Sequence, residues 1–75
     1  MDMIRITLAS PPDRERLVAE VLVGSLQIAE LSRDEESAGA IKLEIYPRPD
    51  GSVWVVDADA FIAAIDEARA RLQSR

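Results

Sequence analysis

Carboxylates are the main candidates for chemistry in this chain, and the nearest cluster is Asp57, Asp59, Asp66 and Glu67. Two carboxyl groups held close together could act as a general acid and a general base. Each of these residues also suits an ordinary role in a helix that begins near Asp57. Asp57 is suited to cap that helix, and Asp59 to complement its positive end, while Asp66 and Glu67 fall outside the apolar stripe. We therefore predict that the cluster is structural and not catalytic.

The residue types that most often support nucleophilic and metal chemistry are missing. The chain has no His and no Cys, so it lacks the commonest general base, the commonest zinc ligand and any thiolate. Its serines have no His to activate them, and Lys42 is the sole lysine. The acidic run at 34–36 lacks the alternating ligands and central Gly of a calcium loop. We predict a protein that is not an enzyme and that holds no metal or cofactor.

The composition favours one small acidic domain spanning residues 1–75. The net charge is −5, which argues against nucleic acid as a partner because phosphates attract a basic surface. No apolar run reaches the ~20 residues of a membrane-spanning helix, and the N-terminus lacks the layout of a signal peptide. A chain of this length buries only about 60 % of its unfolded surface, so a partner or a second copy would add stability. We expect a cytoplasmic protein that does not bind membranes.

A predicted aromatic hairpin over residues 41–56 is the most informative pattern. Its centre, Pro-Asp-Gly at 49–51, suits a type I turn followed by a left-handed glycine. That turn pairs Tyr46 with Trp54. Strand alternation then places both aromatic side chains opposite the aliphatic face. The aliphatic face would consist of Ile41, Leu43, Ile45, Val53 and Val55.

The first half of the chain predicts three further strands, one of them ambiguous. Residues 4–9 alternate apolar and polar side chains, as a half-buried strand does. Residues 17–23 also alternate and lead through a two-residue Gly-Ser turn into a strand at 26–31. The same region has the apolar spacing of a helix at 11–23. We prefer the strand and keep a β-α-β-β-β-α order, with the helix at 11–23, as the alternative.

The tight turn also sets a register between the second and third strands. It places Val21 opposite Ile28, Ala19 opposite Glu30 and Val18 opposite Leu31. Because alternate side chains share a face, Leu31 would lie with Val18 on one side of the sheet and Ile28 on the other.

The last segment, residues 57–73, predicts an amphipathic helix. Its inner stripe would be Phe61, Ile65, Ala68 and Leu72. One helix is about 10 Å wide and can cover only one face of a sheet. The expected fold is therefore a two-layer α+β domain, with an antiparallel meander of about five strands and this helix packed on one face.

The face of the sheet that the helix does not cover would then be rich in apolar side chains. Such a patch commonly marks an interface. The sequence therefore predicts a non-catalytic interaction module that binds another protein, with a homodimeric structural or regulatory domain as the alternative. The predicted partner-binding residues are Tyr46, Trp54, Val18, Leu22, Leu31, Lys42 and Glu44.

The second half of the chain resembles a group of small uncharacterised bacterial proteins. The resemblance rests on residues 43–51 (LEIYPRPDG) and on the positions of Trp54, Asp57 and Phe61, with Ala64, Ala68 and Leu72 following in the helix. These proteins share a strand-turn-Trp-strand unit followed by a terminal amphipathic helix. The layout is similar to that of immunity proteins, which neutralise toxins of neighbouring bacteria by tight non-catalytic binding. The resemblance thus implies an immunity or antitoxin role.

Overall fold

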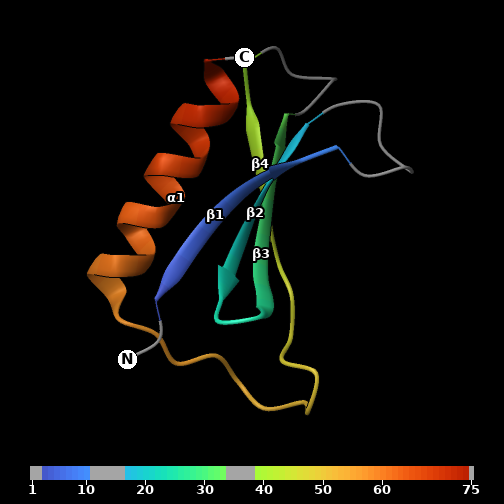
Figure 1. Ribbon diagram of the computed structural model, residues 1–75, viewed down its shortest axis with the longest axis vertical. Coiled ribbons are helices and arrows are strands. Elements are labelled where there is room, and N and C mark those ends of the chain that lie inside the picture. The colour runs from blue at the N-terminus through green and yellow to red at the C-terminus, as the bar shows by residue number, and fades with distance from the viewer. Residues whose placement is uncertain (1–2, 11–16, 34–38, 75) are drawn as a thin grey trace.

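The computed structural model describes residues 3–10, 17–33 and 39–74, which form an antiparallel sheet with one helix packed on it (Figure 1). The four strands follow one another in space as they do in the sequence, in the order β1-β2-β3-β4. The predicted α+β fold is confirmed, with four strands in place of about five. The elements are β1 (Ile4–Ala9), β2 (Val18–Val23), β3 (Leu26–Arg33), β4 (Ile41–Ile45) and α1 (Ala58–Gln73).

Residues 18–23 form a strand, so the alternative helix at 11–23 is wrong over this part. Three β-branched valines favour the extended backbone, and β2 pairs on both sides, with β1 and with β3. Gly24, with φ +62, allows the tight turn that follows. Residues 11–16, where the alternative helix would begin, and the acidic run at 34–36 lie outside the described residues.

The register of β2 and β3 begins as predicted and then shifts at a β-bulge. Beside the turn, Val23 lies opposite Leu26. Ile28 is an extra residue in β3, so Val21 lies opposite Ala29 and Ala19 opposite Leu31. The predicted pairs Val21 with Ile28, Ala19 with Glu30 and Val18 with Leu31 are therefore wrong.

The bulge exchanges the two faces of β3 beyond it. Ala29 and Leu31 join the buried cluster that includes Ala68 and Leu72 of α1, whereas Glu30 lies in register with Glu20, on the opposite face of the sheet. A single extra residue thereby moves two predicted surface residues into the core.

The predicted fifth strand, over 53–56, does not form. The turn itself is confirmed, because the Gly51 amide donates to the Arg48 carbonyl oxygen at 2.9 Å and Gly51 has φ +82. Residues 52–57 then run past the end of the sheet to the start of α1 (Figure 1). The helix packs mainly on β2 and β1, at the far side of the sheet from β4, so the chain must leave β4 to reach it.

The core lies between α1 and the sheet. The helix stripe is confirmed, since Ala68 and Leu72 are buried and Phe61 and Ile65 pack against the cluster. Asp57 caps the helix as predicted, its Oδ2 accepting from the Ala60 amide at 2.9 Å. The buried members of the cluster are Ala19, Val21, Val23, Ile28, Ala29, Leu31, Ala68 and Leu72.

Candidate interaction surface

Trp54 is attached to the core, so its predicted place on the face opposite the aliphatic residues is wrong. Its ring is half-buried and packs against the cluster between sheet and helix. The indole Nε1 donates a hydrogen bond of 2.8 Å to the carbonyl oxygen of Tyr46. Val56 turns the same way and packs against the same cluster, while Val53 and Val55 on either side of Trp54 are exposed. Trp54 therefore holds the segment 52–57 against the end of the sheet.

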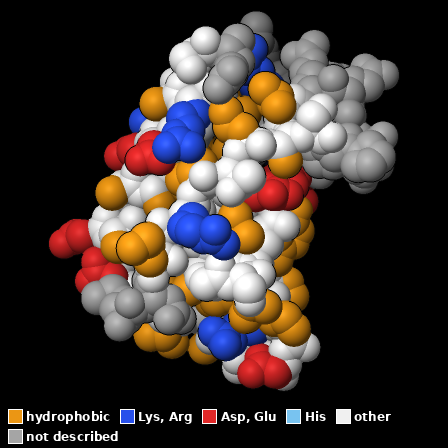
Figure 2. All heavy atoms as spheres, viewed as in Figure 1, with side chains coloured by type: hydrophobic (Ala, Val, Ile, Leu, Met, Phe, Trp, Pro, Cys, Tyr) orange, Lys and Arg blue, Asp and Glu red, His pale blue; other side chains and the backbone are white. Residues whose placement is uncertain are grey.

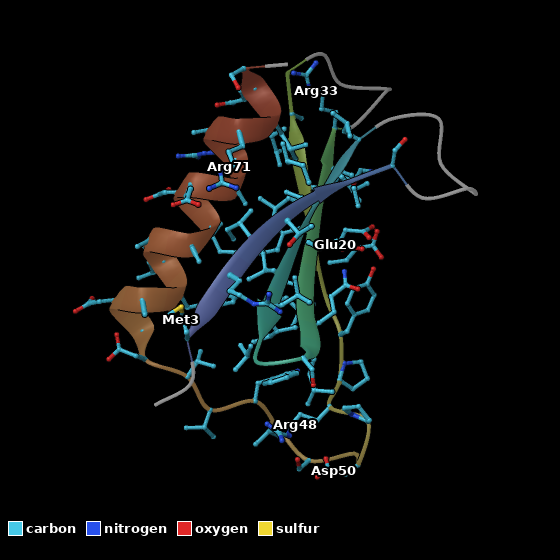
Figure 3. The ribbon with its side chains drawn as sticks, viewed as in Figure 1. Met3, Glu20, Arg33, Arg48, Asp50 and Arg71 are labelled. Atoms are coloured by element: carbon cyan, nitrogen blue, oxygen red, sulfur yellow. The ribbon has the colours of Figure 1, made fainter. Side chains whose placement is uncertain are left out.

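The turn before Trp54 is held by a second group of polar contacts. The Arg48 guanidinium lies over the indole ring of Trp54, 4.7 Å from its centroid, in cation–π geometry. Asp50 Oδ1 accepts hydrogen bonds from the Ser52 hydroxyl at 2.6 Å and the Ser52 amide at 3.0 Å. These two bonds, chiefly the one from the hydroxyl, lower the pKa of the Asp50 carboxyl below its ordinary value. Arg48 and Asp50 lie together at the end of the molecule far from the last turn of α1 (Figure 3).

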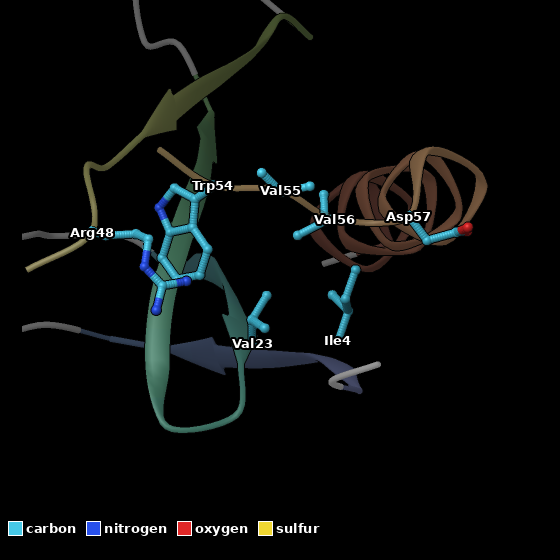
Figure 4. A pocket seen from close by; sticks show the side chains of 7 residues that line it. All are labelled: Ile4, Val23, Arg48, Trp54, Val55, Val56 and Asp57. Carbon is cyan, nitrogen blue, oxygen red and sulfur yellow. The ribbon is translucent and has the colours of Figure 1, made fainter. Parts of the chain in front are cut away.

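A pocket of about 250 Å³ lies between the segment 52–57 and the ends of β1 and β2 (Figure 4). Its wall combines aliphatic side chains with the Arg48–Trp54 stack. The polar groups in it, Arg48 and Asp57, already serve the turn and the helix cap. The pocket thus belongs to the structural junction between sheet and helix. Its lining residues are Ile4, Val23, Arg48, Trp54, Val55, Val56 and Asp57.

A row of carboxylates crosses the face of the sheet opposite α1. Glu30 of β3 lies directly opposite Glu20 of β2 on one side and Glu44 of β4 on the other. Thr7 of β1 continues the row next to Glu20. Glu30 is only 7 % exposed. This face, predicted to be a mainly apolar surface, therefore carries acidic side chains across its middle.

The predicted partner-binding residues divide into three groups by their exposure. Val18 and Leu31 are 1 % exposed, so neither can offer a surface to a partner in this fold. Leu22, Tyr46 and Trp54 are half-buried, and Trp54 packs against the core. Lys42 and Glu44 are exposed, and both belong to β4. The structure therefore keeps two of the seven at an accessible strand and does not gather the set into one patch.

The exposed apolar side chains lie elsewhere, chiefly on β4 and the segment that follows it. On β4, Ile41 is half-buried, Leu43 is 43 % exposed and Ile45 is 61 % exposed. These three share the face that bears α1, since Leu43 is in register with the core residue Leu31. Ile41 packs against the core cluster, whereas Leu43 and Ile45 are uncovered because α1 packs on β2, β1 and β3. The exposed large apolar side chains among the described residues are Met3, Leu43, Ile45, Val53, Val55 and Ile62.

The two edges of the sheet differ in how they are covered. At the β1 edge, Arg71 reaches from α1 toward the sheet (Figure 3), and its Nη1 donates to the Ile6 carbonyl oxygen at 3.5 Å. On the view of Figure 2, with β1 in front, acidic, basic and hydrophobic side chains are interspersed. At the other edge, β4 pairs with β3, and the part of the chain that the structure describes places no strand on its outer side. We call this outer edge, with the side chains of Leu43 and Ile45, the β4 surface.

The carboxylates Asp57, Asp66 and Glu67 have structural partners in the described part of the chain. Over the ranges 3–10, 17–33 and 39–74, no group of three or more acidic side chains is arranged to hold a metal ion. Asp57 caps α1, and Asp66 and Glu67 pair on the helix surface with Arg69 at 3.2 Å and Arg71 at 2.7 Å. The only described helix, α1, is not long and apolar enough to cross a membrane.

Comparisons with known proteins identify no relative. No protein-family model matches the chain, and neither does any curated protein or any solved structure. The sequence and the geometry of the described residues therefore supply the whole basis for a functional proposal.

Proposed function

We propose that this protein is a non-catalytic interaction module that binds another protein chain through the β4 surface. The observation that carries the proposal is the pair Leu43 and Ile45, large aliphatic side chains that are 43 % and 61 % exposed on the helix-bearing face of an edge strand. An edge strand presents unpaired backbone donors and acceptors, which an extended segment of another chain can satisfy. Apolar side chains beside that edge would add affinity by leaving water.

The residue types of the chain support the same proposal. With no His and no Cys, the chain depends on carboxylates for any acid–base chemistry. Asp57 serves as the helix cap, and Asp66 and Glu67 serve as ion-pair partners. Binding is therefore a better explanation than turnover of a substrate for the exposed aliphatic side chains of β4.

A narrower form of the proposal is an immunity or antitoxin role, in which the partner is a toxin. It is supported by the resemblance of residues 43–72 to small immunity-like proteins and by the net charge of −5, which suits a basic partner. A toxin-like gene beside the coding sequence, and neutralisation of its product by this protein, would support this form. A neighbouring gene product that does not bind the purified protein would contradict it.

The experiment for the general proposal compares two exposed apolar positions. Ile45→Lys places a charge on the β4 surface, and Met3→Lys is the matched control, because Met3 is also largely exposed but precedes β1. Partners captured by the unaltered protein are identified, purified and tested by calorimetry against both variants, with circular dichroism to verify folding. We expect Ile45→Lys to abolish binding and Met3→Lys to preserve it. Equal binding by both variants would contradict the proposal.

A further inference from the structure

The direction of the backbone groups on β4 determines what its outer edge can pair with. The Tyr46 amide donates to the Ile28 carbonyl oxygen of β3 at 2.9 Å. Backbone groups alternate in direction along an antiparallel strand, so those of Glu44 and Lys42 also point toward β3. Those of Ile41, Leu43 and Ile45 point outward, away from the sheet. The outer edge thus presents a regular series of donors and acceptors at every second residue.

The sequence of β4, Ile-Lys-Leu-Glu-Ile, is complementary to itself when it is reversed about Leu43. In an antiparallel pair of two copies centred there, Leu43 lies opposite Leu43 and Ile41 opposite Ile45 of the second copy. These are the residues whose backbone groups point outward, so they can exchange hydrogen bonds. On the other face, Lys42 of each copy lies opposite Glu44 of its partner. Opposite charges in directly facing pairs are favourable.

Neighbouring registers lack this match. Pairing centred on Glu44 sets Glu44 against Glu44, and pairing centred on Lys42 sets Lys42 against Lys42. Like charges that face each other directly are destabilising, so the charges on the strand select the register centred on Leu43. Charged residues on an edge strand usually prevent association, but here the same two charges favour one arrangement.

The opposite edge of the sheet does not share these properties. β1 carries Arg5 as its one charged residue, and pairing of two copies about Ile6 would set Arg5 against Thr7, with no opposite charge. Arg71 of α1 also donates a hydrogen bond to the Ile6 carbonyl oxygen at this edge. Of the two edges, β4 is therefore the one suited to a second copy.

We infer that the β4 surface binds β4 of a second copy of this chain, in antiparallel pairing centred on Leu43. The product is a two-fold symmetric dimer with one continuous sheet, four strands from each copy, and both helices on the same face. The inference rests on the proposed function, because it uses the same surface and names its partner. Leu43 and Ile45 of the two copies form an apolar row across the junction.

Charge reversal on β4 tests the pairing directly. Molecular mass is measured by sedimentation equilibrium over a concentration series, starting from the protomer mass of 8.3 kDa. Lys42→Glu and Glu44→Lys each set two like-charged pairs at the junction, so each variant alone should dissociate at least about tenfold more readily than the unaltered protein. A mixture of the two variants should form a mixed dimer, because residues 42 and 44 then have opposite charges in both of their facing pairs. The double variant Lys42→Glu/Glu44→Lys should also dimerise.

The control is Gln73→Glu, an exposed charge change at the end of α1 that should leave the dimer unchanged. A protein that stays monomeric at every concentration overturns the inference. A dimer whose dissociation is unchanged by Lys42→Glu and by Glu44→Lys overturns the inference as well. If the monomer nevertheless binds a different purified protein and loses it in Ile45→Lys, the proposed function stands and only the identity of the partner is wrong. If Ile45→Lys affects neither self-association nor binding, both proposals fail.

Discussion

The indole Nε1 of Trp54 donates a hydrogen bond of 2.8 Å to the main-chain carbonyl oxygen of Tyr46, eight residues earlier. Tyr46 is the first residue after β4, and its own amide still bonds to β3. A side-chain bond from Trp54 thus takes the place of the strand ladder that a hairpin would have formed. It brings segment 52–57 against the core and allows the chain to cross from β4 to the start of α1.

Removing the ring should therefore destabilise the protein. Phe or Trp truncated to Ala in a full core costs about 3–5 kcal/mol, and the half-buried Trp54 should give about 2–3 kcal/mol for Trp54→Ala. Trp54→Phe keeps most of the packing and loses the hydrogen bond, so about 0.5–1.5 kcal/mol is expected. Urea unfolding followed by far-ultraviolet circular dichroism gives both values. A Trp54→Ala variant as stable as the unaltered protein would show that the ring does not hold the junction.

The Trp54 result shows where prediction from the sequence succeeds and where it stops. The turn at 48–51 depends on Pro49, Asp50 and Gly51 themselves, and the helix depends on its cap and its stripe, so local residue types specify both. The fate of residues 53–56 depends on where α1 packs. Their alternation fits a strand equally well, and only the position of the helix over β1 and β2 directs Trp54 into the core.

The register of β3 could not be predicted for a related reason. A tight turn sets the pairs next to it, and Val23 does lie opposite Leu26. Beyond those pairs the strands could form either a regular ladder or a ladder with a bulge, and side-chain packing in the core selects the bulge. The bulge at Ile28 brings Leu31 to the core and turns Glu30 away from α1. A regular ladder without the bulge would have placed Glu30 on the core face and Leu31 on the opposite face. The bulge removed Ala29 and Leu31 from the predicted apolar face, and the missing fifth strand removed Trp54 and Val56. The exposure of β4 was not predicted because it depends on where α1 packs on the sheet.

The Asp57 cap at the start of α1 should stabilise the helix. Its Oδ2 accepts from the Ala60 amide at 2.9 Å, which satisfies one donor at the start of α1. Asp57→Ala should lower the free energy of unfolding by about 1 kcal/mol, whereas Asp57→Asn should lower it much less because Asn is an equally good cap. Thermal unfolding of the two variants side by side makes the comparison. Equal losses would indicate that the charge, and not the cap bond, supplies the effect.

Asp50 should titrate below the ordinary Asp pKa of about 3.9. The hydroxyl and amide of Ser52 donate to its carboxylate and lower its pKa. A depressed pKa means that the stabilisation is complete above the ordinary value and is lost as the pH falls through the folded pKa. NMR chemical shifts of the Asp50 carboxyl carbon, recorded from about pH 2 to about pH 6, measure this pKa because that range brackets the titration. Ser52→Ala should raise the Asp50 pKa; an unchanged midpoint would contradict the assignment.

The facing carboxylates of β2 and β3 should weaken the fold. Glu20 lies directly opposite Glu30, and like charges in that position are unfavourable. Glu20→Gln keeps the shape of the side chain and removes its charge, so it should raise the free energy of unfolding by about 0.2–1 kcal/mol. Salt screens such repulsion, so the gain should be larger at about 0.01 M ionic strength than at about 1 M. Glu67→Gln is the matched control, because it removes an exposed ion pair with Arg71 and should lower stability slightly. A loss of stability in Glu20→Gln would show that Glu20 makes a favourable contact that outweighs its repulsion with Glu30.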